Sequence, residues 1–95
     1  MQMKTASFHE GIQRELAGSP EFMREVFAQS FESMIDGEIE VGLIMLHDIV
    51  KAQIGFPELA RRTGMNEKSL HRALSRRGNP TMRTLARVRR ALQEA

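Results

Sequence analysis

The side chains best suited to chemistry in this sequence are hydrogen-bond donors gathered in one short stretch. They are Asn66, Lys68, Ser69, His71 and Arg72. Lysine and arginine can bond to N7 and O6 of guanine, and the shorter polar groups can reach base edges or phosphates. At helical spacing Lys68, His71 and Arg72 share one face, while Leu70 and Leu74 lie on the other. We therefore expect this face to contact DNA bases, although the solvated face of any amphipathic helix has the same pattern.

A second polar group follows directly and is suited to the DNA backbone. It consists of Ser75, Arg76, Arg77, Asn79 and Thr81. Gly78, Asn79 and Pro80 are typical of a loop, after which Thr81 can cap a helix. The free N–H groups and the dipole at a helix N-terminus favour a phosphate. We expect phosphate contacts here, the alternative being a surface turn whose arginines only aid solubility.

Two short helices are predicted to position these groups. Pro57 suits the first position of a helix, and Gly64 is expected to end it. Asn66 is a good N-cap, and Glu67 lies in the first turn of a second helix that we expect to run to about Ser75. This pattern predicts a helix-turn-helix, in which a glycine turn joins two helices and the second helix has a polar outer face.

The same region resembles a known family of regulators. Residues 55–92 resemble the helix-turn-helix of Cro/repressor-like proteins, and more narrowly the antidote (antitoxin) proteins of bacterial addiction modules, in the stretch ELARRTGMNEKSLHRALSRRGNPTMRTLARVRRAL. Two positions depart from the pattern. Phe56 stands where many Cro-like domains have a glutamine that contacts phosphate, and His71 stands where the antidote family commonly has a tyrosine.

The resemblance implies both a fold and a function. It implies an all-α domain with a lambda-repressor-like helix-turn-helix in its C-terminal half. It also implies a transcriptional regulator that binds a palindromic operator as a homodimer and represses its own promoter. In a type II toxin-antitoxin module such a protein would neutralise a small basic toxin of the RelE-like, mRNA-cleaving type.

Composition indicates one cytoplasmic globular domain covering residues 1–95. The chain has 41% hydrophobic and 27% charged residues, which is ordinary for a folded domain. It has no Cys, and therefore no disulfide or thiol chemistry, as expected in a reducing compartment. Its longest apolar run, Val41 to Leu46, is far shorter than the roughly 20 residues of a membrane span.

Charge divides the chain into two halves. Residues 1–55 carry four basic and nine acidic side chains, a net charge of −5, and residues 56–95 carry ten basic and three acidic ones, a net charge of +7. A polyanion would be attracted to the second half and repelled by the first. The charge pattern therefore favours nucleic acid bound through one face only.

Helical periodicity extends through the rest of the chain, which predicts five or six helices and no strands. The expected segments are 8–17, 20–35, 38–53 and a last helix after Thr81. The helix at 20–35 should bury Met23, Val26, Phe27, Phe31, Met34 and Ile35. The last helix should bury Met82, Leu85, Val88 and Leu92. The segment 38–53 is apolar over more than half its circumference and should lie centrally.

These segments form two functional parts. Residues 55–93 are expected to be the DNA-binding unit, and residues 8–53 an acidic helical part. Within it Phe8, Ile12 and Leu16 recur at four-residue spacing beside Glu10 and Glu15. This stretch is a candidate for docking a partner or for a dimer contact, and a plain core role is equally compatible with it.

Other classes of function have weaker support. An enzyme is not expected, because His9, His47 and His71 lie in separate segments and no metal-ligand or nucleophile motif is present. No cofactor is implied. RNA binding lacks exposed aromatic platforms, since Tyr and Trp are absent. The main alternative is a protein-interaction module or adaptor that does not read DNA specifically.

Overall fold

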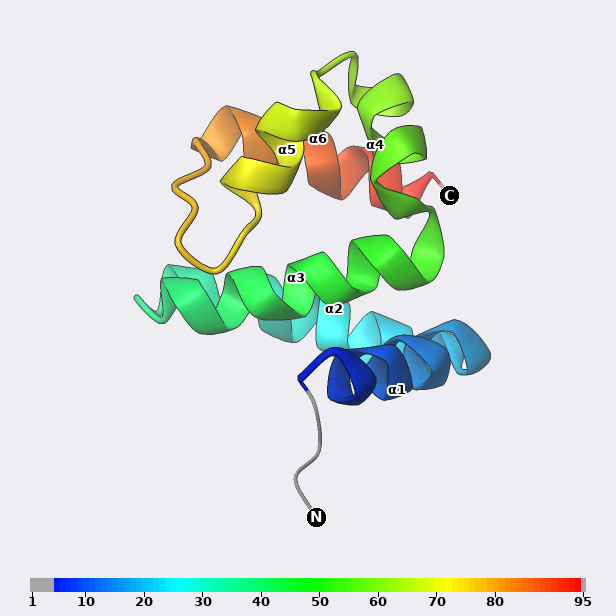
Figure 1. Ribbon diagram of the computed structural model, residues 1–95. Helices are drawn as coiled ribbons and strands as arrows, with labels where there is room; N and C mark the ends of the chain where they lie inside the picture. Colours follow the sequence, from blue (N-terminus) through cyan, green and yellow to red (C-terminus); the bar gives the residue numbers. More distant parts are fainter. Residues whose placement is uncertain (1–4, 95) are drawn as a thin grey trace.

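A computed structural model of the protein describes residues 5–94, which form six α-helices and contain no strand (Figure 1). The helices are α1 (Thr5–Gly18), α2 (Pro20–Ile35), α3 (Ile39–Gln53), α4 (Gly55–Thr63), α5 (Glu67–Ala73) and α6 (Met82–Gln93). The all-α class predicted from periodicity is confirmed. None of the helices in this range is long and apolar enough to cross a membrane.

Helix α3 is the central element of the fold. Helices α1 and α2 pack against one side of it, and α4, which carries α5 and α6 with it, packs against another (Figure 1). Leu43, Leu46, Ile49 and Val50 of α3 are all completely buried. This confirms the central position predicted from the wide apolar surface of this segment.

Helices α2 and α3 approach each other closely at Gly42. A Cβ atom on Gly42 would lie 2.5 Å from the backbone oxygen of Ser30 and would also overlap Met34. Ser30 is itself completely buried, and its hydroxyl donates to the Phe27 carbonyl at 2.7 Å. Small residues on both helices thus let the two backbones approach each other.

Capping side chains start three of the helices as predicted. Ser19, Asn66 and Thr81 each accept a hydrogen bond from a backbone N–H in the first turn of α2, α5 and α6. Gly64 ends α4 in the left-handed conformation, with φ of 72°. Several boundaries differ from prediction. Helix α1 runs over Thr5–Gly18 where 8–17 was expected, and α3 begins at Ile39, one residue late. Helix α4 begins at Gly55, ahead of Pro57, and α5 ends at Ala73, before Ser75.

Two apolar residues predicted to lie in the core are exposed instead. Ile35 is 81% exposed and Met82 is 76% exposed, because each lies at the end of its helix, where no neighbouring element covers it. The stretch from Phe8 to Leu16 is helical and ordered within α1. Leu16 joins the core at 1% exposure, whereas Phe8 remains 52% exposed.

Candidate nucleic-acid interface

Helix α5 presents its polar face to solvent. Leu70 and Leu74 are fully buried and hold the helix against the core. The five predicted base-contacting residues are all exposed: Asn66, Lys68, Ser69, His71 and Arg72. Helix α5 itself lies on the side of α3 opposite to α1 (Figure 1).

Asn66 is the N-cap of this helix. Its Oδ1 accepts the backbone N–H of Ser69 at 3.1 Å, so the carbonyl end of the side chain is used as the cap. The amide nitrogen is the end that can donate to an external acceptor. A DNA contact by Asn66 would therefore be made by its NH₂ group.

His71 is held by aromatic contacts that connect three helices. Its ring stacks on Phe56 of α4, with centroids 3.8 Å apart and an interplanar angle of 24°. His47 of α3 lies against both, with its centroid 5.1 Å from that of Phe56 and 5.6 Å from that of His71. The two positions that depart from the family pattern are thus in direct contact with each other.

The environment of His47 disfavours its charged form. Burial lowers the pKa of His47, and the nearby His71 lowers it further, while the Asp48 carboxylate opposes them. The sequence analysis placed the histidines in separate segments and did not predict this cluster of His47, Phe56 and His71. No local spacing could have revealed it, because the rings come from three different helices.

The loop after α5 is shaped by local hydrogen bonds. The Ser75 hydroxyl donates to the Arg72 carbonyl at 2.7 Å, and the Gly78 N–H donates to the Ser75 carbonyl at 2.8 Å. Thr81 Oγ1 accepts the Thr84 N–H at 3.1 Å. Ser75 is half-buried, whereas Arg76, Arg77, Asn79 and Thr81 are exposed. Of the five predicted phosphate-contacting residues, Ser75 and Thr81 therefore already use their side chains within the loop.

Arg76 has an acidic partner from the other half of the chain. Its Nε lies 3.3 Å from Oε2 of Glu40 in α3, and both side chains are more than half exposed. Arg77 forms no ion pair within residues 5–94. The two adjacent arginines therefore differ, since a phosphate would have to compete with Glu40 for Arg76.

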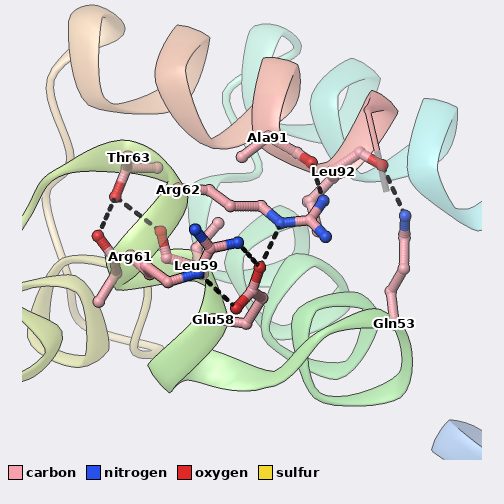
Figure 2. Close-up of polar contacts among 9 residues, drawn as sticks. Gln53, Glu58, Leu59, Arg61, Arg62, Thr63, Ala91 and Leu92 are labelled. Atoms are coloured by element: carbon pink, nitrogen blue, oxygen red, sulfur yellow. Dashed lines mark hydrogen bonds and ion pairs between the residues drawn. The ribbon is translucent and has the colours of Figure 1, made fainter.

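Polar contacts join α4 and the last residue of α3 to the end of α6 (Figure 2). Glu58 accepts hydrogen bonds from Arg61 and, at 2.7 Å, from Arg62. These two arginines lower the pKa of Glu58 to about 2. Arg62 also donates to the Ala91 carbonyl at 3.4 Å, and Gln53 donates to the Leu92 carbonyl at 2.5 Å. Arg61 and Arg62 thus have an intramolecular role that sequence reasoning did not assign.

A second network attaches α1 to α3 around the buried Asp48. Its carboxylate oxygens lie 2.8 Å from His9 Nδ1 and 2.8 Å from Gln13 Nε2. Asp48 is only 5% exposed, so these contacts satisfy a carboxylate within the protein. Among the described residues, no group of three or more His, Cys, Asp or Glu side chains is placed to hold a metal ion.

Comparison with known proteins gives one family and one curated relative. Residues 21–95 match the model of a family described as probable addiction module antidote protein. An uncharacterized protein of Haemophilus influenzae is 38% identical over 61 residues, which is 64% of this chain and 62% of the relative. The chain thus spans less than two thirds of the relative's length. No solved structure matches the chain.

Proposed function

This chain belongs to the family of probable addiction module antidote proteins, and we propose that it is an antitoxin that binds the promoter of its own module through α5. The observation that carries the DNA-binding part is the combination of a buried Leu70 and Leu74 with an exposed, donor-rich opposite face. This face belongs to the half of the chain with net charge +7. A short helix anchored in this way can enter the major groove without disturbing the core.

In this proposal α4 and α5 are the two helices of a helix-turn-helix, and α5 reads bases. Arg72 and Lys68 are the side chains that can bond to guanine N7 and O6. Asn66 and Ser69, at the start of α5, are proposed to contact bases or phosphates. His71, stacked on Phe56, offers the exposed edge of a ring whose orientation is already determined.

The loop between α5 and α6 would contact the DNA backbone. Arg77 and Asn79 are exposed there, and Thr81 caps α6, whose first N–H groups can face a phosphate. Arg76 would join them by leaving Glu40. Phosphate contacts of this kind set the position of the protein on the duplex, and base contacts supply the specificity.

The acidic half of the chain would bind the toxin. Helices α1 and α2 expose Glu10, Glu15, Glu21 and Glu25, and α1 also exposes Phe8. This surface suits a small basic partner, as the expected RelE-like toxin would be. Helix α3 lies between α1 and α5 (Figure 1), so a toxin bound to α1 and DNA bound to α5 would occupy separate surfaces. One chain could then hold both partners at once.

Fluorescence anisotropy with the full chain tests the DNA-binding part. The probes are a duplex that flanks its own gene and a scrambled duplex of equal length, each at several salt concentrations. If each subunit of a dimer neutralises about four phosphates, log K should fall against log salt with a slope near about −7. Equal, weak binding to both duplexes, or a much flatter slope, would contradict the proposal.

A second candidate function is an antitoxin or adaptor that does not read DNA. Two observations favour it, because each occupies a side chain that was expected to contact DNA. The ring of His71 is stacked against Phe56, and Arg76 is paired with Glu40. Reversing the charge of Arg72 and Arg77 separates the candidates. Under the DNA-binding proposal this double variant loses promoter binding and still neutralises the toxin. Under the alternative it behaves like the unchanged protein in both assays.

A further inference from the structure

An exposed apolar surface lies at one end of the molecule, where α2 ends and α6 begins. Ile35 is 81% exposed, Met82 is 76% exposed and Ile39 is 44% exposed. Together with Phe31, Met34 and Leu85 they line a groove of about 380 Å³. We call this surface the α2–α6 patch, since it joins the end of α2 and the start of α3 to the first turns of α6.

The patch is formed by distant parts of the chain. The turn between α2 and α3 and the start of α6 lie at the same end of the fold, next to the loop that follows α5 (Figure 1). On α6 the residues of the patch recur at helical spacing as Met82, Leu85, Ala86 and Arg89. Large apolar side chains gathered on an exposed surface are typical of an interaction site.

Charges at the margins of the patch indicate which partner fits. Asp36 and Glu38 flank Ile35 and Ile39 in the α2–α3 turn, and all four are exposed. On the α6 side, Arg83 follows Met82, and Arg89 lines the groove itself. One margin is therefore acidic and the other basic. A copy of the chain related by a twofold axis that runs between the two margins would bring the acidic margin of each subunit onto the basic margin of the other.

We propose that the α2–α6 patch is the interface through which two copies of this chain form a homodimer. The choice of a second copy rests partly on the proposed function, because reading two half-sites needs two copies of α5. The patch adjoins the 76–80 loop, so pairing through it would place both α5 helices beside the same interface. A basic toxin would instead meet Arg83 and Arg89 at this surface.

Sedimentation velocity of the full chain over a range of concentrations tests the interface. The unchanged protein should dimerise, and Met82→Glu and Ile35→Glu should each weaken association by about tenfold or more, since each places a charge in an apolar contact. Both residues are already exposed in a single chain, and a carboxylate at the first position of α6 suits the helix dipole. Thermal melts should therefore show that both variants fold.

Two further sets of variants make the test specific. Val41→Glu is the matched control, because Val41 is 43% exposed but does not line the groove, and it should leave association unchanged. Glu38→Arg and Arg89→Glu should each weaken the dimer, and together they should restore it. A protein that remains monomeric, a Met82→Glu variant that dimerises normally, or an equal loss in Val41→Glu would overturn the proposal.

DNA and toxin binding distinguish this inference from the proposed function. If the protein binds its promoter but stays monomeric at every concentration, the interface is wrong and the DNA-binding function stands. If Met82→Glu produces a monomer and neither form binds promoter DNA, the interface stands and the DNA-binding function fails. A Met82→Glu variant with unchanged association and lower toxin affinity would assign the patch to the toxin and overturn the inference.

Discussion

The imidazole of His71 stacks on the phenyl ring of Phe56, and this contact links α5 to α4. Phe56 is only 3% exposed, so the exposed ring of His71 stacks on a buried side chain. Helix α5 has seven residues, too few to be stable in isolation. Its orientation must therefore come from packing, through Leu70 and Leu74 on one side and His71 at the junction with α4.

Phe56→Ala should destabilise the protein far more than His71→Ala. Removing a buried phenyl ring leaves a cavity and should lower the free energy of unfolding by about 3 kcal/mol. Removing the exposed imidazole loses mainly the aromatic contact, about 1 kcal/mol. Urea denaturation measures both changes. His71→Tyr keeps a ring at this position and serves as the control, with stability near that of the unchanged protein. Equal losses in the two alanine variants would contradict this account of the contact.

His47 should make the protein less stable as the pH falls below about 6.5. Burial holds the folded-state pKa of His47 below the ordinary histidine value of 6.5, so in this range the unfolded chain binds a proton that the folded protein does not. His47→Gln should show a smaller loss of stability over the same pH range. An NMR titration of the His47 ring should give a midpoint below 6.5, and His71→Tyr should raise it. A midpoint at or above 6.5 would refute the prediction.

Gly42→Ala should destabilise the packing of α2 on α3. The added methyl group would meet the Ser30 carbonyl oxygen, a backbone atom that cannot rotate away. We expect a loss of about 2 kcal/mol in the free energy of unfolding. Gly11→Ala in α1 is the matched control, because nothing lies within 4 Å of its added Cβ. There alanine should stabilise the helix by up to about 1 kcal/mol. Equal effects at the two sites would rule out the close approach.

Glu40→Gln should strengthen DNA binding if Arg76 contacts phosphate. The exposed ion pair is weak, so freeing Arg76 should tighten binding only about two- to five-fold in anisotropy. Arg76→Gln should weaken binding. Glu25→Gln on α2 removes the same charge from a site outside this pair and controls for net charge. If the two glutamate variants behave alike, Arg76 has no specific part in DNA binding.

Short-range signals in the sequence were sufficient to locate the helices. Ser19, Asn66 and Thr81 cap three of them as predicted, because capping depends on a side chain and an N–H only a few residues apart. The division of charge between the two halves is likewise a property of composition alone. The residues proposed to contact DNA were all identified at this level, and their roles remain predictions.

Tertiary structure alone decided which residues meet. Sequence periodicity identifies the apolar face of a helix but not what covers it, which is why Ile35 and Met82 were wrongly placed in the core. The contact of His71 with Phe56 joins positions on two different helices, and Asp48 meets His9 across 39 positions. Such contacts depend on how whole helices pack, and packing sums many weak interactions that no local pattern encodes.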